Sequence, residues 1–463
     1  TMKRSHDPDA TSTFKLTKKC DIEEIMSQVC IPEHVWKVII SYMKDRNKLL
    51  ELRSANKFFD SLITSRIHSE KLWEKLSYQH KIIPWHRQIA ASVRLLHFTE
   101  TDGSLANHER WRKIYFGYRK WVQTPIIRKQ PELFPPFRTE SMMKKYTCVA
   151  AWGGFTVMAI GKGMISLYFN HEHMTELQLP TPSRHLKIEK IEFWKQKNAS
   201  VIIYGRLENG RVVFWNVRDG EIINFNASLY ENIRCMDHSE LISISNDLSN
   251  LTEYYYVEET DQIVGDNYRI IGLSQLRINL NEYKILDFFS NSENVVVMGK
   301  IENELLIVKI KILKQDFNSY HFHDSWIVEL DGTFSENLIC HIPICDIVLL
   351  AHGQQLFMLT PDRYFDEVRY HVSNFEFQKE ITSLKMFCNC IIIGYIDGTI
   401  RTIYIDDYQT YEKHGYGAEI TELEYTLDVG NNAVIDIDIS TKKNWELYIV
   451  AVTKSSTYQL TFE

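Results

Sequence analysis

The chain of 463 residues is longer than one ordinary hydrophobic core, which predicts two or three domains. Its 44% hydrophobic and 24% charged residues are typical of a globular protein, and no apolar run approaches the roughly 18 residues that would span a bilayer. Residues 1–145 hold 27 Lys+Arg against 16 Asp+Glu, whereas residues 146–463 hold 26 against 44. The acidic second part would repel phosphate, which argues against nucleic-acid binding, and would attract a basic partner.

Residues 1–19 are polar and lack the apolar core of a signal peptide. We therefore expect residues 1–28 to form a flexible N-terminal tail, and we expect a protein of the cytoplasm, the nucleus or both, without membrane contact. The eight cysteines form no C-x-x-C pair, which favours free, reduced thiols.

Short helices are expected between residues 29 and 76. Pro32 suits a first helical turn, and apolar residues then recur at steps of three and four. Two further apolar groups, around Leu50 and Phe59, predict a second and a third helix, and the group around Trp73 closes the unit. So short a segment cannot cover all of these apolar faces, which suggests a surface for a partner.

Three stretches of this segment resemble the F-box. Residues 31–43, Ile-Pro-Glu-His-Val-Trp-Lys-Val-Ile-Ile-Ser-Tyr-Met, are similar to the opening pattern Leu-Pro-x-Glu-Ile-Leu-x-x-Ile-Leu-Ser-Tyr-Leu. Residues 49–59 are similar to the second F-box segment, and Trp73 stands where a tryptophan commonly ends the motif. The departures from the pattern are His34 for Glu, Ala55 for Val and Phe59 for Trp.

The resemblance implies that residues 29–76 bind the SKP-family adaptor of a cullin ubiquitin ligase, mostly through apolar contact. The residues expected to bind the adaptor, some of which must also serve the internal core, are Ile31, Pro32, Val35, Ile39, Ile40, Met43, Leu49, Leu52 and Trp73. The alternative is a plain three-helix core without an adaptor role.

The next two segments connect this unit to the second half. Residues 77–122 remain helical and aromatic in character, and Arg110–Tyr115 resembles the linker that follows an F-box in proteins with a propeller. Residues 123–145 contain four of the chain's 11 prolines and predict an extended connector, because proline lacks a backbone donor.

After the connector, apolar residues alternate at the strand period, and one hairpin pattern recurs. The seven predicted hairpins turn near residues 163, 210, 249, 303, 353, 398 and 455. Two of the turns contain Asn-Gly or Asp-Gly, at Asn209-Gly210 and Asp397-Gly398, and these pairs favour tight hairpins. The spacing is close to the roughly 40–50-residue period of four-stranded propeller blades. Residues 146–463 are therefore expected to form a seven-bladed β-propeller, with a pair of β-sandwiches as the alternative.

Two strands carry a family resemblance. Residues 210–217 and 397–406 resemble the ending of WD repeats, with Trp215-Asn216 in the place of Trp-Asp, although the Gly-His opening of the repeat is missing. The resemblance implies a divergent WD-repeat-like propeller. Because an open sheet edge would leave backbone groups unpaired, we expect Tyr146–Ala151, or a segment just before it, to complete the last blade.

The sequence contains no pattern of a catalytic or cofactor site. There is no glycine-rich phosphate loop, no His-Glu-x-x-His and no Gly-x-Ser-x-Gly, so we predict no enzyme, no cofactor and no metal site. The pairs His171/His173 and His321/His323 lie in polar stretches and are interpreted as exposed loop residues.

The functional prediction is a non-catalytic substrate receptor of an SCF-type ubiquitin ligase. The F-box would bind the adaptor, which links it to a cullin, and the propeller would bind a protein cargo that is possibly basic. The alternatives are a non-degradative F-box scaffold or assembly protein and a propeller with an unrelated helical cap. We expect the cargo to bind at the turns between the second and third strands of the blades; the alternative is that these are ordinary solvated turns. The predicted cargo residues are Lys162, Glu208, Asn209, Asn303, His352 and Asp397.

Overall fold

The chain divides into two compact units, residues 1–72 and residues 73–463. The computed structural model describes residues 32–42, 52–55, 57–69, 71–79, 85–92, 110–118, 132–134, 145–161, 163–196, 200–225, 232–273, 282–291, 294–301, 304–316, 319–330, 338–344, 346–362, 369–405, 420–426, 432–441 and 447–461.

The first unit contains helix α2 (Glu33–Tyr42), a helical turn at residues 52–55 and helix α4 (Lys57–Ser69). Pro32 begins α2, where its carbonyl accepts hydrogen bonds from the N–H groups of Val35 and Trp36. The Trp36 ring packs edge-on against Phe59 of α4, with ring centroids 5.0 Å apart. The Arg66 guanidinium donates a hydrogen bond to the Ile40 carbonyl, which ties the end of α2 to α4.

The helices of the second unit are α5 (Leu72–Gln79), α6 (His86–Ser92) and residues 110–118. Trp73 of α5 is buried, and its ring lies against Tyr115 and Phe116 with centroid distances of 5.6 and 5.1 Å. Within residues 77–122, the described parts include the end of α5, α6 and the helical residues 110–118.

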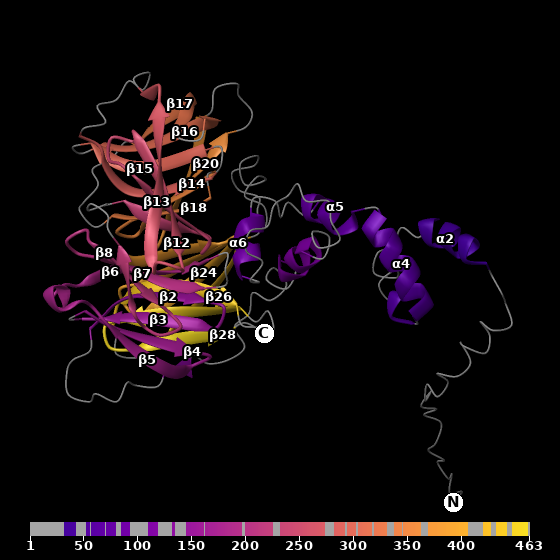
Figure 1. Ribbon diagram of the computed structural model, residues 1–463, viewed down its shortest axis with the longest axis horizontal. Helices are drawn as coiled ribbons and strands as arrows, with labels where there is room; N and C mark the ends of the chain where they lie inside the picture. The colour runs from indigo at the N-terminus through magenta and orange to yellow at the C-terminus, as the bar shows by residue number, and fades with distance from the viewer. Residues whose placement is uncertain are drawn as a thin grey trace, which may run out of the picture. The chain divides into compact units, whose positions relative to one another are not determined.

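Strands make up most of the second unit (Figure 1). They are β1 (Glu132–Leu133), β2 (Tyr146–Trp152), β3 (Phe155–Ile160), β4 (Met164–Phe169), β5 (Glu172–Gln178), β6 (Ile188–Lys195), β7 (Val201–Leu207), β8 (Val212–Asn216), β9 (Ile222–Phe225), β10 (Ile233–Met236), β11 (Glu240–Ile244), β12 (Asn250–Val257), β13 (Gln262–Ile271), β14 (Lys284–Ser290), β15 (Asn294–Ile301), β16 (Glu304–Asp316), β17 (Ser319–Leu330), β18 (Leu338–Ile344), β19 (Ile347–His352), β20 (Gln355–Asp362), β21 (Arg369–Glu376), β22 (Ile381–Phe387), β23 (Cys390–Tyr395), β24 (Thr399–Ile405), β25 (Ile420–Thr426), β26 (Val434–Thr441), β27 (Leu447–Thr453) and β28 (Thr457–Thr461). A short 3₁₀ helix, Thr181–Ser183, lies between β5 and β6.

Consecutive strands pair in antiparallel runs of four, beginning with β2–β5. The first strands of the runs contact one another in a closed cycle, from β2 through β6, β10, β14, β18 and β22 to β26 and back to β2. Antiparallel sheets arranged radially around a central channel define a β-propeller, so this part of the prediction is confirmed. The first and last sheets meet where the magenta strands lie beside the yellow ones in Figure 1.

The predicted hairpins coincide with the second and third strands of these runs. Gly210 between β7 and β8 has a φ of 79°, and Gly398 between β23 and β24 has a φ of 82°, a region that favours glycine. Strand alternation and turn residues act locally, which explains why the sequence alone located the hairpins.

The ring is completed by a segment other than Tyr146–Ala151. That segment forms the inner strand β2, whereas β1 pairs with the outer edge of β28, with Glu132 opposite Gln459 and Leu133 opposite Tyr458. The closing strand therefore lies in the proline-containing connector, before β2, because only a segment outside the first sheet can supply the missing fourth strand of the last one.

The long strand β13 joins three of the antiparallel runs at their outer edges. It pairs in parallel with β9 at one end and with β17 at the other, so that twelve strands form one continuous sheet. Nothing in the sequence pattern indicated these two pairings.

The prediction of loop positions for the His-x-His pairs was wrong in part. His171 lies in the turn between β4 and β5, but His173 belongs to β5, and both His321 and His323 belong to β17. Polar residues are frequent around both pairs, which hides the strand period in the sequence. The described residues contain no group of His, Cys, Asp and Glu side chains that could hold a metal ion.

Candidate functional site

Helix α2 has two apolar faces. Trp36 and Ile40 face α4, and Ile40 is fully buried. The other face carries large apolar side chains that remain exposed, at 54% for Val38, 42% for Ile39 and 80% for Tyr42. These residues follow Val35 at helical steps of three, four and seven, which places them on one side of the helix. A continuous apolar stripe in water is the usual mark of a protein-binding surface.

The predicted adaptor-binding residues fall into three groups in the structure. Ile31, Met43 and Leu49 lie outside the described residues. Pro32 and Ile39 are exposed, and Val35 and Leu52 are half-buried. Ile40 and Trp73 are buried, so their role in the structure is internal packing. Sequence reasoning missed Val38, Tyr42 and Phe58, although the helical spacing of the first two from Val35 was available as a signal.

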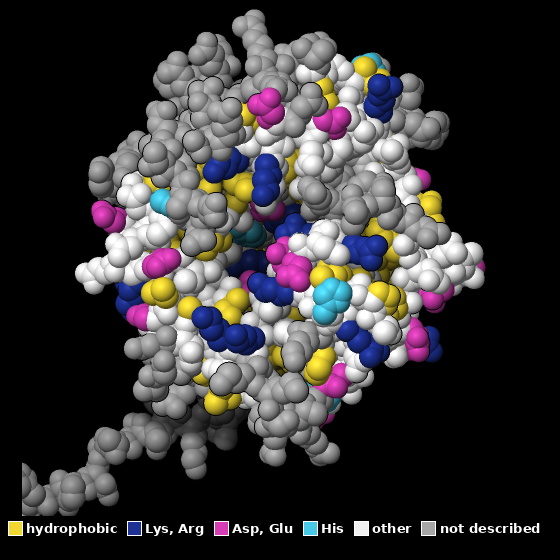
Figure 2. All heavy atoms as spheres, turned by 90° about the vertical axis from the view of Figure 1, so that its left-hand side faces the viewer, with side chains coloured by type: hydrophobic (Ala, Val, Ile, Leu, Met, Phe, Trp, Pro, Cys, Tyr) yellow, Lys and Arg dark blue, Asp and Glu magenta, His cyan; other side chains and the backbone are white. Residues whose placement is uncertain are grey.

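A channel of about 460 Å³ runs through the centre of the propeller and is lined by the first strand of every antiparallel run. Helix α6 lies against one end of it. There the Gln88 side-chain oxygen accepts a hydrogen bond from the Cys388 N–H at 2.9 Å, and its nitrogen donates to the Pro343 carbonyl at 3.1 Å. The opposite face is hollowed at its centre, and both basic (Lys, Arg) and acidic (Asp, Glu) side chains lie around the hollow (Figure 2).

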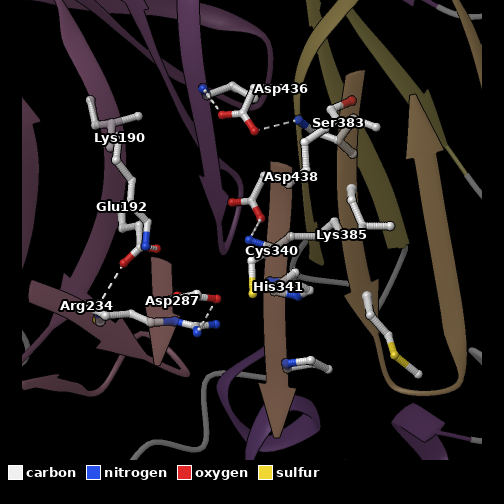
Figure 3. A pocket seen from close by; sticks show the side chains of 18 of the residues that line it. Lys190, Glu192, Arg234, Asp287, Cys340, His341, Ser383, Lys385, Asp436 and Asp438 are labelled. Carbon is white, nitrogen blue, oxygen red and sulfur yellow. Dashed lines mark hydrogen bonds and ion pairs between the residues drawn. The ribbon is translucent and has the colours of Figure 1, made fainter. Parts of the chain in front are cut away.

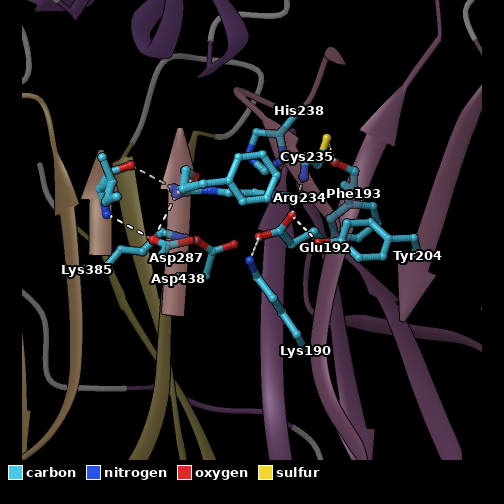
Figure 4. Close-up of polar contacts among 12 residues, drawn as sticks. Lys190, Glu192, Phe193, Tyr204, Arg234, Cys235, His238, Asp287, Lys385 and Asp438 are labelled. Carbon is cyan, nitrogen blue, oxygen red and sulfur yellow. Dashed lines mark hydrogen bonds and ion pairs between the residues drawn. The ribbon is translucent and has the colours of Figure 1, made fainter. Parts of the chain in front are cut away.

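Charged side chains of the channel wall form ion pairs (Figures 3 and 4). Lys190 Nζ lies 3.1 Å from Glu192 Oε1 on the same strand. Two further pairs connect different strands: Arg234 Nη1 lies 2.9 Å from Asp287 Oδ2, and Lys385 Nζ lies 2.9 Å from Asp438 Oδ1. Each of these two ion pairs therefore joins neighbouring sheets.

Glu192 is held in its ionised form. Burial alone would raise its pKa, but Lys190, Arg234 and Lys385 together lower the pKa of Glu192 to about 2. Its Oε2 also accepts hydrogen bonds from the Tyr204 hydroxyl at 2.7 Å and from the Cys235 N–H at 3.0 Å, which connects β6 to β10 (Figure 4).

Ionisation of Glu192 makes a testable contribution to stability in acid. Because the folded-state pKa of about 2 lies below the ordinary value of 4.5, the stabilisation is complete above about pH 4.5 and is lost as the pH falls toward 2. A pKa difference of this size corresponds to about 3 kcal/mol. We expect Glu192→Gln to remove this part of the acid dependence, measured as the denaturant midpoint between pH 5 and pH 2.5. Glu189→Gln, which replaces an exposed carboxylate of the same strand, is the control. If the denaturant midpoint of Glu192→Gln falls with pH as steeply as that of the wild type, the assignment is contradicted.

The seam between the last and first sheets uses side-chain acceptors in register. Alternate residues of β26 accept hydrogen bonds from alternate N–H groups of the β2 segment: Asp436 from Val149 at 2.9 Å, Asp438 from Ala151 at 2.8 Å and Ser440 from Gly153 at 2.8 Å. The alternation of Asp and Ser with isoleucine over residues 435–440 was visible in the sequence, but its meaning depends on the neighbouring strand.

Of the predicted cargo residues, Glu208, Asn209 and Asp397 lie on turns between second and third strands, whereas His352 is the last residue of β19, so its predicted turn position was wrong. Two of the turn residues bond within their own turns. Asn209 Oδ1 accepts from the Arg211 N–H at 3.1 Å, and Asp397 accepts from Thr399 and pairs with Lys379 at 2.9 Å. Glu208 is exposed and His352 is half-buried. Lys162 and Asn303 lie outside the described residues. Antiparallel order places these turns on the face of the ring opposite α6, around the open end of the channel.

The similarity of the chain to known proteins is remote. No protein-family model matches the chain, and no curated protein matches it. Similar solved structures include the WD40 repeats of RRP9 (TM-score 0.46, 8% identity, 72% of this chain and 98% of that chain), the β-propeller domain of Cps50 (Swd1) from Myceliophteria thermophila (0.44, 9%, 71% and 98%) and U3-55K (0.45, 8%, 72% and 98%). The propeller fold is established by the strand order itself, and these weak similarities add nothing about function.

In the part of the chain that the structure describes, no helix combines the length and the apolar character needed to cross a membrane.

Proposed function

We propose that this protein is a non-catalytic receptor subunit that couples a protein cargo to a cullin ubiquitin ligase. Residues 29–76 act as an F-box that binds the SKP-family adaptor, and residues 146–463 act as a seven-bladed propeller that holds the cargo. The seven antiparallel runs, the last one completed by β1, support this blade count. Ubiquitin transfer takes place on another subunit, so the receptor acts by holding cargo near it.

The observation that carries the proposal is the exposed face of α2. Ile39 and Tyr42 lie on the outer side of a helix whose inner side already packs on α4. Burial of a large apolar side chain stabilises a complex by about 1.5–3 kcal/mol. Two or three such residues at the centre of an interface are enough to dominate its affinity.

The test is adaptor binding by the full chain with Ile39→Glu. A carboxylate at this position would be buried without a partner in the complex, so we expect the affinity for a purified SKP-family adaptor to fall at least about 100-fold. Because Ile39 is exposed in the unbound chain, the fold should remain intact, which circular dichroism would verify.

His34→Glu is the matched control, since it adds the same charge to the same helix and restores the residue of the F-box pattern. We expect it to retain adaptor binding. Unchanged adaptor affinity of Ile39→Glu would overturn the proposal. If both the adaptor and a cullin bind but the captured cargo keeps its cellular lifetime, the role is that of a scaffold rather than of a degradation receptor.

A further inference from the structure

One carboxylate near the open end of the channel lacks a cationic partner. Glu192, Asp287 and Asp438 each form an ion pair within the channel wall. Asp436, by contrast, accepts hydrogen bonds from two backbone N–H groups, those of Val149 and Ile437, both at 2.9 Å. No ion pair of Asp436 occurs among the described residues. Lys385 acts on Asp436 electrostatically, but its ammonium group is paired with Asp438.

Asp436 lies toward the open end. The turns that follow the inner strands contact α6, as at Cys388, so each inner strand runs from the open face toward that helix. Asp436 precedes Asp438 on β26, and Figure 3 shows it beside Ser383, with Asp438 and Lys385 further along the channel. Asp237, another carboxylate of the lining, lies in the turn between β10 and β11 at the α6 end.

The electrostatic environment of Asp436 favours the approach of a positive charge. Burial raises the pKa of Asp436 to about 6, and Asp438 adds to this effect, while the Val149 N–H and Lys385 oppose it. Holding the ionised carboxylate at neutral pH therefore costs stability in the absence of a ligand. A cation that arrives at this position relieves that cost, whereas an anion increases it.

The deeper part of the channel has the opposite preference. Burial, Lys385 and Arg234 lower the pKa of His341 well below its ordinary value, so the imidazole is neutral at pH 7 in a positive local field. At the level of His341, burial and these two cations therefore disfavour a further positive charge.

We propose that the open end of the channel binds one cationic side chain, an arginine or a lysine, of the protein that the propeller holds, with Asp436 as the countercharge. This inference rests on the proposed function and specifies the chemistry of its cargo. The net charge of the second part, with 44 Asp+Glu against 26 Lys+Arg over residues 146–463, attracts a basic partner toward the same ring. The cavity of about 460 Å³ has room for such a group and its hydration.

In the test, the full chain is titrated with the capped tripeptide acetyl-Gly-Arg-Gly-amide at low ionic strength, and binding is monitored by NMR. We expect weak binding to the wild-type protein and a dissociation constant at least about 10-fold higher for Asp436→Asn. The asparagine oxygen can still accept from the Val149 N–H, so the variant should fold. Asp397→Asn is the control, because that carboxylate lies on the same face but is already paired with Lys379; it should bind the peptide as the wild type does.

Three results would overturn the inference: no binding of the arginine peptide to the wild type, equal binding to Asp436→Asn, or tighter binding of acetyl-Gly-Glu-Gly-amide or of inorganic phosphate. The last result would assign the channel to an anionic ligand through Lys190 and Lys385. Adaptor binding by Asp436→Asn should be unchanged, so failure here is distinguishable from failure of the α2 surface.

Discussion

Replacing Arg234 with alanine is expected to lower the free energy of unfolding of the propeller by about 3–5 kcal/mol, because the buried Asp287 carboxylate loses its countercharge. The guanidinium also donates to the carbonyls of Phe288 at 2.6 Å and Ile342 at 2.9 Å. It therefore spans three neighbouring inner strands, β10, β14 and β18, and its loss leaves acceptors unsatisfied on two of them. Denaturant midpoints of the purified variants are the measurement.

Arg206→Ala is the control for this prediction. Arg206 also lines the channel, but its 3.7 Å contact with Glu189 is solvent-exposed, and exposed ion pairs contribute about 0–1 kcal/mol. A similar, small change in midpoint for both variants would show that the channel charges do not hold the ring together.

Deleting residues 457–463 is expected to abolish cooperative unfolding of the propeller. This deletion removes β28, whose Tyr458 and Leu460 are buried. It leaves one edge of β27 unpaired, although β26 still pairs with the other edge, and it removes the strand with which β1 pairs. Each buried side chain contributes about 1.5–3 kcal/mol, and exposed backbone groups add to the loss, which together approach the 5–15 kcal/mol that typically stabilises a folded domain. Calorimetry of the truncated chain should show no sharp transition.

A chain that ends at Thr461 is the control for the deletion, since it retains every residue of β28. We expect it to unfold at the wild-type temperature. If the chain without residues 457–463 keeps a sharp transition near that temperature, the last sheet does not need its third strand, and closure through β1 is not what stabilises the ring.

The sequence by itself determined the features that depend on neighbours along the chain. Apolar alternation and glycine at Gly210 and Gly398 located the hairpins, because turns and strand pairs of adjacent segments are local. The helical stripe after Pro32 identified α2 and its excess of apolar surface for the same reason. The acidic balance of residues 146–463 was likewise a property of composition alone.

Only the tertiary structure decided which apolar residues of α2 are exposed, which segment completes the ring and what the channel contains. Ile39 and Ile40 are adjacent and chemically alike, yet packing on α4 buries one and leaves the other in water. Arg234 and Asp287 are far apart in the sequence and meet because the sheets close into a cycle. Asp438 pairs with Lys385, whereas Asp436 forms no ion pair among the described residues. That difference arises from the placement of a neighbouring strand rather than from any spacing along the chain.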